Sequence, residues 1–222
     1  MSRDRPVPIF SGGHVENDAR PNAESATLKR QEAHSRFAAH RDHYALRYMC
    51  HLLMRVAVVV GNPSPRSRTR AVAHAVAGWI CRRYDGEVAV DLDLIDYARE
   101  IFDSPSEELD ALTAAVAKSD VLVVASPTYK GTYTGLLKAF FDRYGNDGLA
   151  GVDAVPVMTA GSPLHGLAID HALRPLLVEL GASVPTRGLC FLVPAQMSEL
   201  DEVVESWAAA NLSALRAAIP RS

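Results

Sequence analysis

From residue 54 onward the chain alternates between apolar runs of strand length and longer stretches with helical spacing. The run at 120–125, DVLVVA, is apolar after its first residue, which is typical of a strand buried on both faces of a parallel sheet. Pro185 interrupts the last run, so we expect its strand to enter the sheet late. The predicted strands are 55–60, 87–94, 120–125, 152–159 and a segment within 182–193.

The stretches between these runs have the spacing of amphipathic helices. Apolar residues at 72, 76, 79 and 80 mark the first helix. The sequence SPSE at 104–107 has the pattern of a capping box with proline at the first helical position, so a second helix is expected to run to about Lys118. A third helix is expected over 135–144.

Two further helices complete the pattern. One is expected to begin at Ser162 and to end near Gly181, with a kink at Pro175. Ser198 is expected to cap a final helix that stops before residue 220. Strand and helix thus alternate five times, which predicts an α/β fold whose parallel sheet is covered by helices on both faces.

Residues 1–53 differ in composition from the rest of the chain. They carry eight basic and six acidic residues, whereas the remaining residues carry 15 and 20. The segment up to about Asn22 mixes proline, glycine, serine and charge without apolar periodicity, and the segment after it favours helix but has few large apolar residues at helical spacing. We therefore expect a largely disordered or loosely helical extension at 1–53 and one domain at 54–222.

Four interpretations of the extension remain open. It is a poorly ordered segment upstream of a functional start at Met54, an arm that contacts a partner or a second copy, a metal site built on His40 and His43, or a targeting presequence. No carboxylate-supported constellation surrounds the two histidines, which disfavours the metal site. The acidic residues disfavour a mitochondrial presequence, because such segments are poor in acids. We prefer the first interpretation.

Composition narrows the class of protein. The formal net charge of −3 argues against a dedicated nucleic-acid binder. The three cysteines form no CxxC pair, so neither a disulfide scaffold nor a zinc site is indicated. No apolar run approaches the roughly 18 residues of a membrane span, and the N-terminus lacks the apolar stretch of a signal peptide. We expect a soluble protein of the cytoplasm.

The first loop with candidate chemistry is GNPSPRSRT at 61–69. Ligands of open α/β sheets bind beyond the carboxyl ends of the strands, and this loop follows the first strand. It has one glycine and lacks both the dinucleotide-binding and the P-loop patterns. Hydroxyl groups and arginines at a helix N-terminus form an anion site, so Ser67, Arg68 and Thr69 are candidates for binding a phosphate. A capped helix beside a solvated arginine-rich turn is the alternative.

Two more loops follow the third and fourth strands. The sequence SPTYKGTYTG at 126–135 combines a rigid proline, two glycines and two tyrosines, which suits close approach of the backbone to a flat aromatic ligand. The sequence TAGS at 159–162 has small side chains that leave room for a ring. An ordinary connection whose tyrosines pack on neighbouring helices is the alternative for the longer loop.

Together, the sequences GNPSPRSRT, SPTYKGTYTGLLKAFFDR and TAGSPLHGLAIDHALRPLLVELGA resemble the NADPH-dependent FMN reductases of the flavodoxin-like superfamily. Within these, the chain most resembles the alkanesulfonate-assimilation type, which supplies reduced FMN to a partner monooxygenase. The resemblance covers about 54–222. It implies a flavodoxin-like three-layer sandwich with strand order 2-1-3-4-5, FMN and NADPH as cofactors, and a homodimer or homotetramer. The first loop departs from the family at Asn62, where serine is usual.

The resemblance also implies roles for individual residues. The FMN phosphate would be bound by Ser67, Arg68 and Thr69, and Lys130 would stand at the mouth of the site. Tyr133 matches a tyrosine that, in the sulfonate-type reductases, sits in an irregular helix near the subunit interface and is tied to flavin exchange; simple packing is the alternative. The residues that would line or close the isoalloxazine site are Pro127, Thr128, Tyr129, Gly131, Gly161 and Ser162.

The implied reaction passes a hydride from the nicotinamide to the flavin, so we expect no protein nucleophile and no obligatory general base. His165 and His171 are expected to be structural, and Asp91 and Asp93 to lie on a solvated strand edge rather than in a metal site. Two other functions remain: a quinone, azo-dye or chromate reductase with tightly bound FMN, and a flavodoxin-type electron carrier without NAD(P)H activity. The carrier is disfavoured because the net charge of 54–222 is only mildly acidic.

Overall fold

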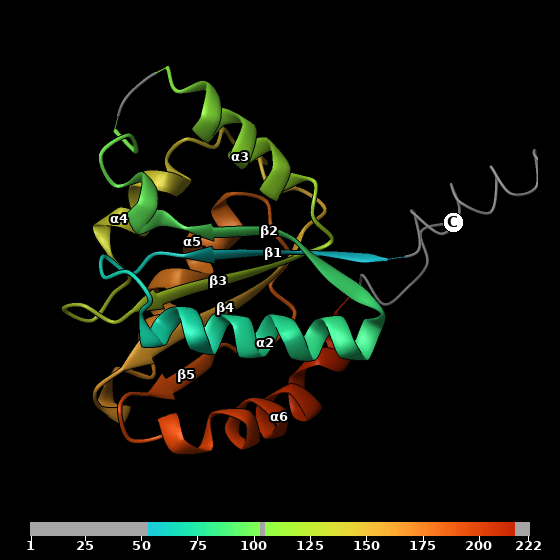
Figure 1. Cartoon of the computed structure of the whole chain (residues 1–222), viewed down its shortest axis with the longest axis vertical. Coiled ribbons are helices and arrows are strands. Elements are labelled where there is room, and N and C mark those ends of the chain that lie inside the picture. Colours follow the sequence, from blue (N-terminus) through green and yellow to red (C-terminus); the bar gives the residue numbers. More distant parts are fainter. Residues whose placement is uncertain (1–52, 103–104, 216–222) are drawn as a thin grey trace, which may run out of the picture. The chain divides into compact units, whose positions relative to one another are not determined.

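The computed structural model describes residues 53–102 and 105–215 and contains a five-stranded parallel sheet in the order β2-β1-β3-β4-β5 (Figure 1). This is the topology expected from the resemblance, and the prediction of the fold class is confirmed. The strands are β1 Met54–Val60, β2 Gly86–Asp93, β3 Val121–Pro127, β4 Asp153–Ala160 and β5 Leu189–Leu192. Of the predicted extension at 1–53, only Leu53 lies within the described residues, so its histidines and its possible roles lie outside them.

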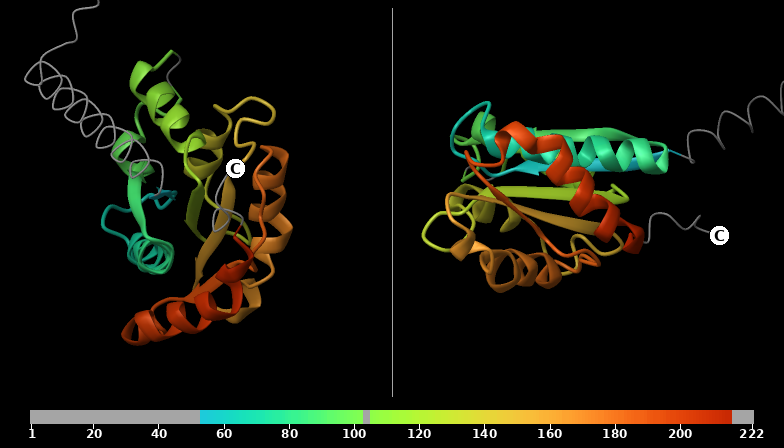
Figure 2. Two further views of the ribbon diagram at one scale, coloured as in Figure 1. Left: turned by 90° about the vertical axis from the view of Figure 1, so that its right-hand side faces the viewer. Right: turned by 90° about the horizontal axis from the view of Figure 1, so that it is seen from below.

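Helices cover both faces of the sheet because successive residues of each strand point to opposite sides. Figures 1 and 2 show α2 and α6 on one face and α3, α4 and α5 on the other. In β1, Val58 packs with α2 and α6, whereas Val59 packs with the opposite layer. The helices are α2 Arg68–Tyr84, α3 Glu107–Ala117, α4 Gly135–Phe141, α5 Arg174–Glu179 and α6 Leu200–Asn211.

The strand predictions hold closely. All residues of β3 are buried, as the apolar run predicted. β5 spans only four residues and pairs continuously with β4 from Leu189 onward. Ser183 already forms an isolated parallel bridge with Asp153 of β4, so the pairing is interrupted between these two points, where Pro185 lies. A proline cannot donate to the ladder, which accounts for the interruption.

Two helix starts differ from the prediction. The N-cap of α3 is Ser106, whose Oγ accepts a hydrogen bond of 3.4 Å from the Leu109 N–H. The helix therefore begins two residues after the predicted position, and Ser104 lies outside the described residues. Ser198 does not cap α6, because Met197–Glu199 form a 3₁₀ turn and the helix follows it at Leu200 without a side-chain cap.

The segment from Ser162 to Gly181 is not one kinked α-helix. It comprises a 3₁₀ turn at Pro163–His165, a π-helical turn at Ile169–Leu173 and then α5. Pro175 lies at the start of α5, directly after the π-helical turn, within a helical segment that continues without a break from one to the other. The predicted single helix from Ser162 is therefore wrong, and the irregularity of the segment lies in the helical turn that precedes Pro175, where a proline ring disturbs regular helix geometry.

Candidate functional site

The three loops singled out from the sequence lie side by side at the carboxyl edge of the sheet. β1, β3 and β4 are neighbours and run parallel, so their carboxyl ends meet. Main-chain hydrogen bonds join the loops beyond the strands: the Gly61 N–H donates to the Ala125 carbonyl at 2.8 Å, and the Thr128 N–H donates to the Thr159 carbonyl at 2.7 Å. These bonds fix the relative positions of the three loops.

The loop between β1 and α2 presents the N-terminus of a long helix. Ser67 is the N-cap, and its Oγ accepts from the Arg70 N–H at 3.1 Å. The Oδ1 of Asn62 accepts from the Ser64 N–H at 2.9 Å and folds the loop back on itself. The first turn of α2 contains no acidic residue, and Arg68 is exposed. The partial positive charge of the helix end and the Arg68 guanidinium therefore favour an anion here.

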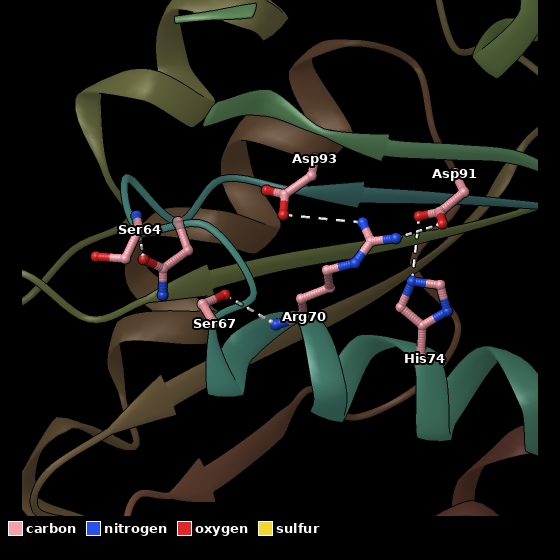
Figure 3. A network of polar contacts seen from close by, with 7 residues as sticks. Ser64, Ser67, Arg70, His74, Asp91 and Asp93 are labelled. Carbon is pink, nitrogen blue, oxygen red and sulfur yellow. Dashed lines mark hydrogen bonds and ion pairs between the residues drawn. The ribbon is translucent and has the colours of Figure 1, made fainter. Parts of the chain in front are cut away.

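Arg70 is directed to β2 instead (Figure 3). Its Nη2 lies 2.6 Å from Asp91 Oδ2 and its Nη1 lies 3.8 Å from Asp93 Oδ2, while His74 Nε2 lies 3.1 Å from Asp91 Oδ1. Burial raises the pKa of the Asp93 carboxyl, and the Arg70 charge opposes that shift. Asp93 is only 6% exposed, so the predicted solvated edge is wrong for this residue: Arg70 of α2 lies against its carboxylate.

The loop between β3 and α4 forms a small hairpin. Tyr129 and Thr132 exchange two main-chain hydrogen bonds of 2.9 and 3.2 Å, and the turn residues Lys130 and Gly131 have φ of 53° and 83°. Positive φ at both positions is the signature of a type I′ turn, whose twist suits a hairpin. The turn leaves Lys130 exposed and Tyr129 49% exposed at the rim of the site.

The base of this hairpin is tied to β1. The Thr134 hydroxyl donates to the Gly61 carbonyl at 2.5 Å and caps α4 by accepting from the Leu137 N–H at 3.2 Å. The Thr134 N–H donates to Ser126 Oγ at 3.1 Å. Thr134 is buried, so these bonds hold the loop against the end of β1. The hairpin tip, with Tyr129, Lys130 and Gly131, is exposed to solvent.

A buried hydrogen-bond chain lies beneath the β1–α2 loop. Asn62 Nδ2 donates to Thr69 Oγ1 at 2.8 Å, and Thr69 Oγ1 lies 2.7 Å from Thr159 Oγ1. Thr69 is 1% exposed, and its hydroxyl is engaged by these two partners. Asn62, the position at which the loop departs from the family, is therefore part of the framework of the loop.

The other residues expected to line the isoalloxazine site lie at the carboxyl ends of β3 and β4 and in the loops that follow them. Pro127 is the buried last residue of β3, and the buried Thr128 Oγ1 has no hydrogen-bond partner within the described residues. Ser162 Oγ accepts from the Leu164 N–H at 3.3 Å and starts the 3₁₀ turn. A Cβ placed on Gly131 or on Gly161 would meet no atom within 4 Å, so both glycines face open space.

Tyr133 is not in an irregular helix. It precedes α4, packs against the core, and lines a groove of about 520 Å³ between α4 and the segment that contains α5. The irregular turn is Ile169–Leu173, and His171 within it lines the same groove. His165 and His171 are both exposed. The resemblance implied an irregular helix at Tyr133, whereas the π-helical turn lies at Ile169–Leu173. The sequence did not reveal this turn, because a π-helical turn has no apolar period of its own.

Residues 54–195 match the family model described as NADPH-dependent FMN reductase. The NADH-dependent FMN reductase SfnF of Pseudomonas putida is 31% identical over 170 residues, which cover 69% of this chain and 91% of that protein. The FMN reductase (NADPH) of Escherichia coli strain K12 is 33% identical over 147 residues, which cover 61% of this chain and 72% of that protein.

A solved structure has the same fold. The apo form of an NADH:FMN oxidoreductase (EMOB) superposes with a TM-score of 0.60 at 29% identity, and the match covers 76% of this chain and 97% of that one. Among the described helices, none combines the length and the apolar character that crossing a membrane requires.

Proposed function

The chain belongs to the NADPH-dependent FMN reductase family, and from this we propose that the three loops at the carboxyl edge of the sheet hold FMN, with its phosphate at the β1–α2 loop. The protein is an NAD(P)H:FMN oxidoreductase. FMN supplies the isoalloxazine ring that takes up a hydride from the reduced nicotinamide. The chain contributes binding, orientation and exclusion of water, and the reaction asks no side chain to act as a nucleophile.

The phosphate end of the proposed site rests on α2. Ser67, Arg68 and Thr69 form its N-cap and first two residues, where main-chain N–H groups have no helical acceptor. Arg68 adds an exposed guanidinium, which binds phosphate through charge-assisted hydrogen bonds. The Thr69 hydroxyl is engaged with Asn62 and Thr159, so we assign to Thr69 a contribution through its main chain.

The ring end of the proposed site lies between the hairpin and the β4 loop. Gly131 and Gly161 face open space and would let a flat ring approach the backbone, while Tyr129 and Lys130 stand at its rim. Thr128 Oγ1, buried and without a partner in the described part of the chain, is a hydrogen-bonding group that this framework does not use. These features fit a flavin. We assign Pro127 and Ser162 to the two edges of the ring site.

The main support for the proposal is that the phosphate end and the ring end of the proposed site are joined by hydrogen bonds. A helix N-terminus with an exposed arginine is joined through hydrogen bonds to two loops that face open space, at the switch point where ligands of such sheets bind. An isolated anion site would need no such connection, whereas FMN has a phosphate and a ring that must be held together.

The proposal is tested by purifying the full chain without added flavin and following NADPH and NADH oxidation while FMN is titrated. Saturable dependence on free FMN is expected. A yellow protein that is already fully active would favour the reductase with tightly bound FMN, and a yellow protein without NAD(P)H oxidation would favour the electron carrier. Comparing the two coenzymes also gives their order of preference, in which the relatives differ by name.

Placement of the phosphate is tested by Arg68→Ala. It should raise the apparent FMN requirement about tenfold or more and leave the turnover at saturating FMN nearly unchanged, because a charge-assisted hydrogen bond contributes about 1.5–3 kcal/mol. Arg82→Ala, at the other end of α2, is the matched control and should leave both unchanged. An unaltered FMN requirement in Arg68→Ala would remove the phosphate from this loop.

We further propose that the protein works in the cytoplasm as a homodimer or homotetramer and passes reduced FMN to a partner monooxygenase. The sequence resemblance to the sulfonate-type reductases supports this. Light scattering of the purified chain tests the oligomeric state. Reduced FMN that reaches an added FMN-dependent monooxygenase without loss to oxygen would support the transfer, whereas a coupling efficiency no better than that of chemically reduced FMN would oppose it.

We also propose that 54–222 is the catalytic domain and that 1–53 is an extension. The family match begins at residue 54, which supports this division. Full activity of a chain that begins at Met54, relative to the whole chain, is the expected result. A loss of activity or a change of oligomeric state would instead assign the extension to catalysis or assembly.

A further inference from the structure

Two buried threonine hydroxyls join the β1–α2 loop to the end of β4. Thr69 Oγ1 and Thr159 Oγ1 lie 2.7 Å apart, and either one can be the donor. Thr69 is 1% exposed and Thr159 is 2% exposed, so water does not compete for this bond. The two residues are 90 positions apart in the sequence, and the bond is a tertiary contact between two loops of the site.

The pair is the centre of a longer chain of hydrogen bonds. On one side, Asn62 Nδ2 donates to Thr69 Oγ1 and Asn62 Oδ1 accepts from the Ser64 N–H. On the other side, the Thr159 carbonyl accepts from the Thr128 N–H at 2.7 Å. The chain therefore runs from the loop at the start of α2 to the loop at the end of β3.

We propose that Thr159 and Asn62 are positioning residues that hold the first turn of α2 in the geometry that binds the FMN phosphate, and so give the enzyme its preference for FMN over flavins that lack a phosphate. This inference rests on the proposed placement of the phosphate at the β1–α2 loop. Neither residue touches the flavin phosphate. Both act through Thr69, which lies in the first turn of the helix.

The physical reason is preorganisation. N–H groups bind an anion strongly only when they already point to one place, because ordering them on binding costs conformational entropy. The hydroxyl pair and Asn62 fix the side chain of Thr69 from two directions, so its main chain is held at a constant position relative to β4. Removing one hydroxyl frees the turn and leaves the other hydroxyl with one partner fewer.

The test uses the shape-matched substitution Thr159→Val and the hydroxyl-retaining substitution Thr159→Ser in the full chain. Dissociation constants for FMN and for riboflavin are measured from flavin fluorescence, and kcat is measured with NADPH at saturating FMN. Thr159→Val should bind FMN about fivefold more weakly, which corresponds to about 1 kcal/mol. Its riboflavin affinity and its kcat should stay within about twofold, and Thr159→Ser should restore most of the FMN affinity.

Thr69→Val removes the other partner of the same bond and also the acceptor of the Asn62 amide, so it should weaken FMN binding at least as much as Thr159→Val does. The double substitution should weaken FMN binding no more than Thr69→Val alone, because Thr69→Val already removes the bond that Thr159→Val removes. Thr186→Val is the matched control: Thr186 is 2% exposed, and its hydroxyl has no hydrogen-bond partner among the described residues. It should change neither flavin affinity.

Equal weakening of FMN and riboflavin in Thr159→Val would overturn the inference, because the pair would then support the site as a whole. Unchanged FMN affinity in the folded variant would overturn it as well. If Thr159→Val does not fold, Thr69→Val decides by the same ratio of FMN to riboflavin affinity. Arg68→Ala separates a failure of this inference from a failure of the phosphate placement. If Arg68→Ala binds FMN normally, the phosphate does not lie at the β1–α2 loop. If Arg68→Ala binds FMN weakly, the placement holds, and the threonine variants then test the positioning role alone.

Discussion

Gly61 at the end of β1 lies so close to Leu137 of α4 that a Cβ on the glycine would stand 2.5 Å from the Leu137 Cβ. Real Cβ atoms do not approach so closely, and Leu137 is fully buried and cannot move away. Only glycine fits at this junction of strand and helix. The close approach is what lets the Thr134 hydroxyl reach the Gly61 carbonyl and tie the hairpin to β1.

Gly61→Ala should therefore lower the free energy of unfolding by about 1–3 kcal/mol, the usual cost of overpacking a core. Urea unfolding followed by circular dichroism measures this. Gly135→Ala is the matched control, because a Cβ there meets no atom within 4 Å and its φ is not positive. It should be neutral or slightly stabilising, since alanine favours helix more than glycine does. Equal stability of the two variants would contradict the steric argument.

Gly131 is required for its backbone conformation and not, as Gly61 is, for lack of space. Its surroundings are open, but its φ of 83° is strained for any residue with a Cβ. Gly131→Ala should cost about 1 kcal/mol and loosen the hairpin. Gly131→Asn should cost less, because asparagine tolerates left-handed backbone better than alanine. Thermal unfolding of the two variants checks the order, and a more stable alanine variant would show that space rather than φ governs this position.

Arg174 clamps the segment that leads to β5. Its Nε donates to Asp170 at 2.9 Å, its Nη1 to the Val184 carbonyl at 2.8 Å and its Nη2 to the Thr186 carbonyl at 2.9 Å. Arg174→Lys should destabilise the fold by about 2 kcal/mol, nearly as much as Arg174→Ala, because a single ammonium cannot reproduce a planar fork with three acceptors. Chemical denaturation of both variants measures this. A lysine variant as stable as the wild type would show that the positive charge of Arg174, and not its three hydrogen bonds, stabilises this segment.

The ionisation of Asp93 should make the stability of the fold depend on pH in a predictable direction. Burial raises the pKa of its carboxyl in the folded state, so the charge costs stability as the pH rises from below the unfolded pKa through the folded pKa. Asp93→Asn carries no such charge. Its stability relative to the wild type should therefore improve between pH 4 and pH 8.

Melting temperatures across this pH range test the prediction. Asp91→Asn is the comparison, since Asp91 makes the 2.6 Å ion pair with Arg70 and is more exposed. That variant should be slightly less stable than the wild type at neutral pH. An Asp93→Asn variant that loses stability relative to the wild type as the pH rises would show that the Arg70 pairing outweighs the burial of the carboxyl.

The local pattern of apolar and polar residues predicted most of the strands and the type of sheet. The apolar runs gave four strands nearly at their observed bounds, and the late start of β5 followed from Pro185. The alternation of strand and helix then required a parallel sheet, and a parallel sheet brings the loops after β1, β3 and β4 to one edge. Hydrophobic period and proline geometry depend on neighbouring residues alone, which is why the sequence determines them.

What the sequence could not determine depends on contacts between distant segments. The bond between Thr69 and Thr159 exists because α2 and β4 are packed into one edge, and Asp93 is buried because Arg70 of α2 lies against it. The π-helical turn at Ile169–Leu173 likewise has no period in the sequence. The sequence by itself singled out the three loops that we propose as the flavin site. Only the tertiary structure decided which of their polar groups hold the loops together and which stay exposed, because the hydrogen-bond partners that decide this lie far away in the sequence.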